Sequence, residues 1–190
     1  AKEALAVLKT AKDLPFVWDM AFVEVFEGER EGFDIVIGNP PYVRHQKIAP
    51  PLIQEAGYSA GEWKQHKSRY KALLRESVQT AWPDFFRRRT LAAFSDLYIY
   101  FFFGGLALLD KQGAFCFITS NSWLDVDYGA DLQEFLLRQG HVRLIVDNEA
   151  RRSFAAKVNT AISLLAAPVE HTGSGLACVA RLVMFKRPFE

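Results

Sequence analysis

Hydrophobic and polar residues alternate along this chain in blocks whose lengths predict strands and helices in turn. An apolar run at residues 33–38 follows Gly32 and is short enough for a strand. From Ser95 onward the blocks are regular: a helix over 95–110, a strand over 113–121, a helix over about 128–139, and strands over 142–148, 160–167 and about 176–185. Strands that alternate with helices predict an α/β fold with a mainly parallel sheet.

Two segments stand apart from this alternation. Residues 1–10 have a helical pattern, and the aromatic and acidic segment at 14–28 is expected to cross the sheet before the first strand. Residues 43–92 contain the breakers Pro50, Pro51 and Gly57 and predict two or three inserted helices, of which 67–82 has the clearest helical spacing. With 190 residues, we expect about one domain, 1–190, with a helical insertion at about 43–92.

The composition is that of an ordinary globular protein, with 50% hydrophobic and 24% charged residues. Cys116 and Cys178 lie in apolar runs, and neither they nor the four histidines have metal-ligand spacing. We therefore expect no metal site and a reducing, cytoplasmic setting. The apolar run at 99–109 is too short and too rich in glycine to span a bilayer, so we expect a buried helix there and no membrane partner.

The strand at 33–38 ends in the most informative motif of the chain, Asn39-Pro40-Pro41-Tyr42. In open α/β sheets, ligands bind outside the carboxyl ends of the strands. Proline has no backbone N–H, so this segment offers carbonyl acceptors with few competing donors. The Asn39 side chain and the Pro40 carbonyl are suited to accept hydrogen bonds from a planar amino group that lies against the Tyr42 ring. A turn that simply ends the strand is the alternative interpretation.

The sequence FDIVIGNPPY resembles the catalytic motif of amino-methyltransferases that use S-adenosylmethionine, above all the N6-adenine DNA methyltransferases of type II restriction–modification enzymes. The resemblance runs from Phe33 to about Ala167 and includes SDLY at 95–98 and GAFCFITSNSWL at 113–124. It implies a partial Rossmann-like class I methyltransferase sheet and a prokaryotic cytoplasmic enzyme. It also implies S-adenosylmethionine as cofactor and double-stranded DNA as partner.

The same resemblance implies roles for individual residues. The motif at 39–42 would be catalytic, Asp96 and Phe101 would contact the methyl donor, and Phe154 would stack on the target base opposite Tyr42. A base inside a duplex is out of reach of the donor, so the enzyme would rotate it out of the helix and grip it between the two rings. Such stacking is worth about 1–3 kcal/mol per base. Methyl transfer would then be direct, with orientation as the main contribution.

Positive charge is concentrated directly after the motif. Residues 43–90 hold 10 basic and 4 acidic residues, whereas residues 1–42 have a net charge of −4 and residues 91–190 of −1. A basic stretch beside a site is expected for a polyanionic partner such as DNA, and a solvated helical face is the alternative. The residues expected to contact the DNA backbone are Arg44, Lys47, Arg87, Arg88 and Arg89.

The glycine-rich donor-binding loop that the resemblance implies is missing. No acceptable G-x-G element follows a predicted strand, and the pair Gly104-Gly105 falls inside a predicted helix. We therefore expect a catalytic-half fragment without the donor-binding half, inactive alone, that binds S-adenosylmethionine weakly or not at all. The incomplete sheet would leave an unpaired hydrophobic strand edge. We expect the chain to self-associate or to pair with the missing N-terminal part of the same protein.

Two other functions stay open on the sequence. Asn-Pro-Pro-Tyr methyltransferases also act on glutamine in proteins or on guanine in RNA, but the resemblance implies a shorter connection after the motif in those enzymes than the about fifty residues present here. A non-catalytic DNA-binding or assembly module would also explain the missing donor loop. Transfer of a labelled methyl group to adenine N6, lost on Asn39→Ala, would separate catalysis from such a module.

Overall fold

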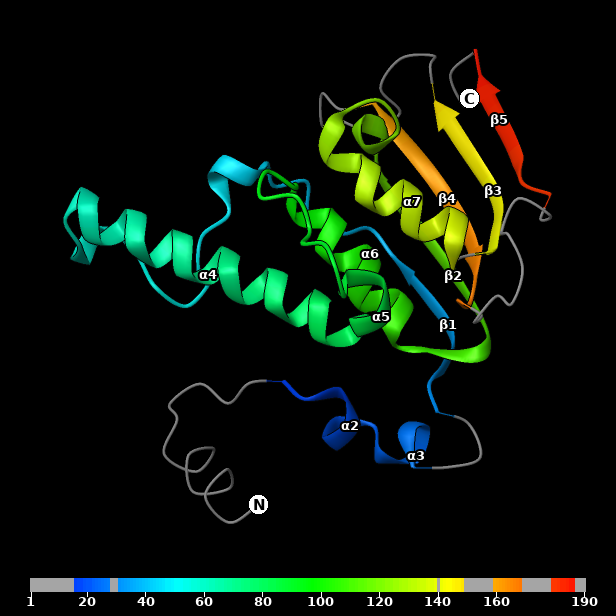
Figure 1. Cartoon of the computed structure of the whole chain (residues 1–190), viewed down its shortest axis with the longest axis horizontal. Coiled ribbons are helices and arrows are strands. Elements are labelled where there is room, and N and C mark those ends of the chain that lie inside the picture. The colour runs from blue at the N-terminus through cyan, green and yellow to red at the C-terminus, as the bar shows by residue number, and fades with distance from the viewer. Residues whose placement is uncertain (1–15, 28–30, 140, 149–158, 169–178, 187–190) are drawn as a thin grey trace.

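The computed structural model describes residues 16–27, 31–139, 141–148, 159–168 and 179–186. These residues form an α/β fold with a five-stranded sheet in the order β1-β2-β4-β3-β5 (Figure 1). The strands are β1 (Phe33–Gly38), β2 (Leu109–Ser120), β3 (His141–Asn148), β4 (Thr160–Ala166) and β5 (Arg181–Phe185). Each strand overlaps one that the sequence pattern predicts, and the α/β class is confirmed. β2 nevertheless begins at Leu109, inside the helix predicted over 95–110.

The helices of the described residues follow the prediction only in part, because the two short ones between residues 18 and 26 were not predicted. They are α2 (Trp18–Ala21), α3 (Val23–Phe26), α4 (Ala60–Ala81), α5 (Pro83–Phe86), α6 (Leu97–Ala107) and α7 (Ala130–Arg138). Four short 3₁₀ turns join them: η1 (His45–Lys47), η2 (Glu55–Gly57), η3 (Asn121–Leu124) and η4 (Asp127–Gly129). Within this part of the chain, no helix combines the length and the apolar character needed to cross a bilayer. The helix predicted over residues 1–10 lies outside the described residues.

The sheet is mixed rather than mainly parallel. β1 pairs with β2 and β3 pairs with β5 in parallel, but β4 runs antiparallel to both β2 and β3. The link from β3 to β4, residues 149–159, is shorter than the dozen or more residues that a parallel crossover takes. β4 therefore turns back beside β3, which the strand pattern alone did not reveal.

The core lies between one face of the sheet and the helices α6 and α7 (Figure 1). Phe102 of α6 is fully buried, and its ring lies 5.4 Å from that of Phe115 in β2. Phe103, also fully buried, lies 4.9 Å from the ring of Phe135 in α7. The apolar run at 99–109 is thus mostly a buried helix, as predicted.

The opposite face of the sheet is apolar and open at β1, an edge strand in the sheet order. Ile35 and Ile37 are 67% and 76% exposed. Their partners on β2, Ala114 and Cys116, lie on the same face of the sheet. β1 is therefore partly buried at Val36 and Gly38, on the face that meets α6, and exposed at Ile35 and Ile37 on the other.

The aromatic segment before β1 does not cross the sheet, contrary to the prediction. The rings of Trp18, Phe22 and Phe26 lie 5.8, 5.3 and 5.4 Å from the ring of Phe33, the first residue of β1. Aromatic side chains pack well edge to face, and here they gather around that ring. α2 and α3 therefore lie at the amino end of β1, away from the motif (Figure 1).

α4 begins earlier than the pattern at 67–82 predicts. Ser59 accepts a hydrogen bond from the Glu62 N–H at 3.4 Å, and the Glu62 carboxylate accepts one from the Ser59 N–H at 2.9 Å. This capping box satisfies two N–H groups that would otherwise lack partners at the helix start. Its Ser-x-x-Glu signature is present in the sequence and would have moved the predicted start to residue 60.

The two glycines of α6 allow the packing of this helix on β2 to be tested. A Cβ at Gly105 would lie 2.8 Å from the Phe115 ring and 3.4 Å from Val36 Cγ1, whereas nothing lies within 4 Å of one at Gly104. We expect Gly104→Ala to raise the free energy of unfolding by about 0.5–1 kcal/mol, because alanine loses less entropy in a helix. Gly105→Ala should lower it by about 1–3 kcal/mol through overpacking. Urea denaturation measures both, and equal effects would contradict this packing.

The exposed face of β1 allows the expected self-association to be tested. Replacing Ile35 and Ile37 together by threonine keeps β-branched side chains in the strand but removes exposed apolar area. We expect the chain to associate in size-exclusion chromatography with light scattering, and Ile35→Thr/Ile37→Thr to shift it toward monomer with unchanged circular dichroism. A parent chain that is monomeric at micromolar concentration would contradict the expectation.

Candidate active site at the carboxyl end of β1

The motif at 39–42 leaves β1 at its carboxyl end, next to the parallel strand β2. The exposed Asn39 side chain and the Pro40 carbonyl make no hydrogen bond with any described residue. The Pro41 carbonyl, by contrast, accepts the Val43 N–H at 3.0 Å. These are the two acceptors that the sequence singled out for a planar amino group, one on the exposed Asn39 and the other on the buried Pro40.

Tyr42 is half-buried, and a hydrogen bond fixes its position. Its hydroxyl donates to the Ile118 carbonyl of β2 at 3.3 Å. Burial raises the pKa of this hydroxyl above the usual value for tyrosine, so the group stays protonated at neutral pH and keeps its proton for the bond. The ring is thereby held beside β2, close in sequence to the two available acceptors.

The loop after the motif is held by the first residues of α6. The Val43 carbonyl accepts the Leu97 N–H at 2.9 Å, and the His45 N–H donates to Asp96 Oδ1 at 2.8 Å. These bonds run in opposite directions between the same two segments. His45 Nδ1 also lies 3.9 Å from Asp96 Oδ1. The position of the motif loop therefore depends on the start of α6.

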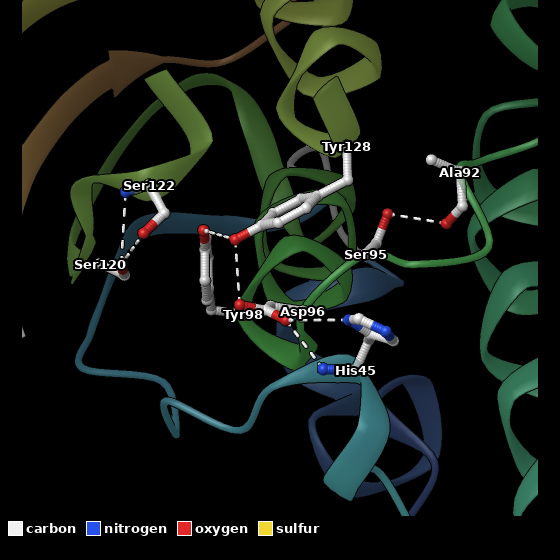
Figure 2. Close-up of polar contacts among 8 residues, drawn as sticks. All are labelled: His45, Ala92, Ser95, Asp96, Tyr98, Ser120, Ser122 and Tyr128. Carbon is white, nitrogen blue, oxygen red and sulfur yellow. Dashed lines mark hydrogen bonds and ion pairs between the residues drawn. The ribbon is translucent and has the colours of Figure 1, made fainter. Parts of the chain in front are cut away.

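A chain of hydroxyl groups continues from Asp96 to Tyr128 and Tyr98 (Figure 2). Tyr128 donates to Asp96 Oδ2 at 2.9 Å and lies 3.0 Å from the Tyr98 hydroxyl. Burial is the main cause that raises the pKa of both tyrosines, so both hydroxyls stay protonated. At the end of β2, the hydroxyls of Ser120 and Ser122 lie 2.8 Å apart. The Asp96 carboxylate thus joins the motif loop, α6 and η4.

The Asp96 carboxylate holds distant segments together, a structural role that the sequence did not predict. Asp96 precedes α6, yet its side chain caps none of the helix N–H groups. Its carboxylate instead accepts from His45, 51 residues earlier, and from Tyr128, 32 residues later. No local sequence pattern joins residues so far apart, so no signal could have found this arrangement. A direct contact between Asp96 and a methyl donor stays a prediction.

The two predicted aromatic contacts have different outcomes. Phe101 is 44% exposed on a helix whose other aromatic side chains are buried. Its ring is therefore not part of the buried core, and its contact with the methyl donor stays a prediction. Phe154 lies outside the described residues, and its role stays a prediction.

Two of the predicted DNA contacts are engaged in ion pairs. Arg87 pairs with Asp84 at 2.6 Å, and Arg89 pairs with Glu134 while lying 4.8 Å from the centre of the Phe85 ring. Ion pairs of this kind offset the positive charge that a phosphate would meet. The remaining candidates are exposed and form no ion pair with the described residues: Arg44, Lys47 and Arg88.

An α/β sheet that carries Asn-Pro-Pro-Tyr at the carboxyl end of a strand defines a domain of the methyltransferase class. The model of the Eco57I restriction-modification methylase family matches residues 6–154, and the chain belongs to this family. The resemblance that the motif indicated is confirmed at this level.

Curated relatives agree with this assignment. The chain is 30% identical over 115 residues to the type II methyltransferase M.PaeR7I of Pseudomonas aeruginosa, an alignment that covers 60% of this chain and 15% of the relative. It is 31% identical over 126 residues to the type II methyltransferase M.BstVI of Geobacillus stearothermophilus, covering 66% and 18%. The chain therefore spans less than a fifth of the length of either relative.

Solved structures with a similar arrangement include a putative class I S-adenosylmethionine-dependent methyltransferase from Listeria monocytogenes. It has a TM-score of 0.48 and 15% identity and covers 82% of this chain and 37% of its own. The Type ISP restriction-modification enzyme LlaBIII bound to DNA has a TM-score of 0.49 and 14% identity and covers 94% and 12%.

The contact between Asp96 and Tyr128 can be tested by a double-mutant cycle. Asp96→Ala leaves the His45 N–H and the Tyr128 hydroxyl without their acceptor, so we expect it to lower the free energy of unfolding by about 1.5–3 kcal/mol. Tyr128→Phe should cost about 1 kcal/mol, and the double variant less than the sum. Asp125→Ala, at an exposed position, should change stability by less than about 0.5 kcal/mol. Additive losses in urea denaturation would contradict a direct contact.

Proposed function

We propose that this protein methylates the N6 amino group of adenine in double-stranded DNA, as the modification part of a restriction–modification enzyme. The observation that carries the proposal is a pair of acceptors at the end of β1, the Asn39 side chain and the Pro40 carbonyl, that have no hydrogen-bond partner among the described residues and directly precede the ring of Tyr42, which bonds to β2. Membership of a restriction-modification methylase family supports DNA, rather than protein glutamine or RNA guanine, as the substrate.

The motif residues would act on the amino group through hydrogen bonding. The Asn39 amide oxygen and the Pro40 carbonyl would each accept one N–H of the target amine. Because both acceptors lie at one strand end, they would draw the nitrogen lone pair out of conjugation with the base and direct it to one side. S-adenosylmethionine, when bound, supplies an electrophilic methyl group on a sulfonium. The two carbonyl oxygens would orient the amine. As the N–C bond forms and the bond from the methyl carbon to sulfur breaks, one N6 proton would leave to solvent.

The base would be presented to the motif outside the duplex. Tyr42 would stack on one face of the flipped base, and Phe154 is the proposed partner on the other face. Such stacking is worth about 1–3 kcal/mol per base and offsets part of the cost of unstacking. The bond from the Tyr42 hydroxyl to the Ile118 carbonyl would keep the ring from rotating away. The ring would then hold the base at a fixed height relative to Asn39.

The methyl donor would be held only in part by this chain. The exposed ring of Phe101 suits contact with the adenine of S-adenosylmethionine, and Asp96 would act by holding the motif loop. The sequence offers no acceptable glycine-rich loop after a strand. We therefore propose that this loop comes from another part of a longer polypeptide or from a partner, and that residues 1–190 are inactive alone.

Methyl transfer by the polypeptide that contains this chain and a donor loop tests the proposal. With duplex DNA and S-adenosylmethionine labelled in its methyl group, we expect label on adenine N6, measured by nucleoside mass spectrometry. Asn39→Ala should reduce the rate by about 100-fold or more, the usual cost of losing one preorganised hydrogen-bond partner. Tyr42→Phe keeps the ring but loses the bond to the Ile118 carbonyl, so it should retain only part of the activity, whereas Tyr42→Ala should lose it.

Three outcomes would contradict the proposal. Label on protein glutamine or on RNA guanine would assign a different substrate. An unchanged rate in Asn39→Ala would remove the motif from catalysis. DNA binding without any label, in a polypeptide that binds S-adenosylmethionine, would favour a non-catalytic module.

A further inference from the structure

α4 carries a row of positive charge along one side. Its members, here called the basic stripe, are Lys64, Lys67, Lys71 and Arg75. At about 100° per residue, these four positions fall within an arc of roughly 80° around the helix axis. The two acidic residues of α4, Glu62 and Glu76, lie at least about 100° from every member of the stripe. The separation of charge on α4 is therefore nearly complete.

The stripe is not neutralised within the described part of the chain. No carboxylate there forms an ion pair with any of its members, in contrast to Arg87 and Arg89. Lys67, Lys71 and Arg75 are half-buried rather than extended into solvent. The pKa of Lys71 is lowered, first by burial and then by the like charges of Lys67 and Arg75. The cations are thus close enough to repel one another.

Such an arrangement lowers the stability of the protein alone, because like charges one helical turn apart repel. An anion bound along the stripe would reverse that cost. The stripe extends over about 16 Å, with steps of roughly 6 Å from Lys67 to Lys71 and from Lys71 to Arg75. A single small anion cannot neutralise a row of this length. A DNA duplex carries one negative charge per about 1.7 Å of its axis and matches the row in both length and sign.

The stripe, on α4, and the candidate active site, after β1, are both held by contacts with α6. α4 packs alongside α6 (Figure 1), and the Trp82 indole N–H that follows α4 donates to the Phe103 carbonyl of α6 at 3.0 Å. Arg75, at the end of the stripe, acts electrostatically on the buried hydroxyl of Tyr100 in α6. The start of α6 in turn holds the motif loop through Leu97. DNA held along α4 would therefore have a fixed position relative to the motif.

We propose that the basic stripe of α4 binds the phosphate backbone of the duplex DNA whose base is methylated. The inference rests on the proposed function for the identity of the partner, but it concerns binding and not methyl transfer. It moves the main backbone contacts of the inserted region from Arg87 and Arg89, which are paired, to Lys67, Lys71 and Arg75, which are not.

Salt-dependent binding of labelled duplex DNA tests the inference, measured by fluorescence anisotropy on the same full polypeptide without methyl donor. Each phosphate contact contributes about 0.9 to the slope of log affinity against log salt concentration. We expect Lys67→Gln/Lys71→Gln/Arg75→Gln to flatten that slope by about 2–3 and to weaken binding by about 10-fold or more at 0.1 M salt. Lys67→Arg/Lys71→Arg/Arg75→Lys should bind as tightly as the parent.

A control with the same loss of charge distinguishes the stripe from net charge. Arg69 lies on the far side of α4, and Lys111 and Lys186 are exposed elsewhere. Arg69→Gln/Lys111→Gln/Lys186→Gln should change the slope by less than about 1. The midpoint of thermal unfolding should not fall in the stripe variant, because removing the positive charges relieves their repulsion. A large fall would mean that weaker binding reflects misfolding. The variant Lys67→Arg/Lys71→Arg/Arg75→Lys then decides, since the proposal requires that variant to bind DNA.

Equal losses of DNA affinity in the stripe and control variants would overturn the inference, as would unchanged DNA binding in the stripe variant. Tighter binding of single-stranded RNA than of duplex DNA through these residues would also overturn it. A parent that binds DNA through the stripe but transfers no methyl group would overturn the proposed function and leave this inference standing. A stripe variant that still methylates DNA and binds it with unchanged affinity would overturn this inference and leave the proposed function standing.

Discussion

The close packing of α6 on β2 is the contact on which the rest of this structure depends. Gly105 lets the helix approach the Phe115 ring to a distance that no side chain would allow. From that position α6 supports α7 through Phe103 and Phe135, α4 through the Trp82 bond, and the motif loop through Leu97 and Asp96. A shift of this one helix would therefore move the core, the basic stripe and the candidate active site together.

The motif itself has few contacts of its own. β1 pairs on one side only within the described residues, with β2, and its outer face is exposed at Ile35 and Ile37. The two acceptors that the proposed chemistry uses have to stay unpaired to be useful, so they contribute nothing to holding the loop in place. The positional order of the site comes instead from residues that follow the motif, Tyr42, Val43 and His45, each of which bonds to another element.

Much of the fold could be predicted because its signals are local. The apolar run of β1 predicts a strand, and the apolar run of α6 predicts a buried helix. The family motif follows β1 directly. The direction of β4 depends on which strands it lies between, and the pattern of a buried strand is the same for either direction. The early start of α4 has a local signal, the Ser59–Glu62 capping box, which the spacing of apolar residues alone does not contain.

The electrostatic part of the site was harder to read, because a residue's charge is local in the sequence but its partner is not. The densest run of basic residues is Arg87-Arg88-Arg89. Two of its members nevertheless form ion pairs, Arg89 with Glu134 of α7 and Arg87 with Asp84. The members of the stripe are spread over twelve residues, and only the helical turn brings them to one side. Asp96 shows the same effect with the opposite sign, since its partners lie 51 and 32 residues away.

The arrangement also separates the groups that hold the site from the groups that would perform the chemistry. Asp96, Tyr98 and Tyr128 have their polar atoms engaged with one another or with the loop, and burial keeps the two hydroxyls protonated. The Asn39 side chain and the Pro40 carbonyl form no hydrogen bond with the described residues. Hydrogen-bonding groups that already face one another lose little by being buried, whereas an open acceptor gains a partner only when an amine arrives. A site divided in this way is rigid before its substrate binds, and a direct transfer that depends on orientation requires that rigidity.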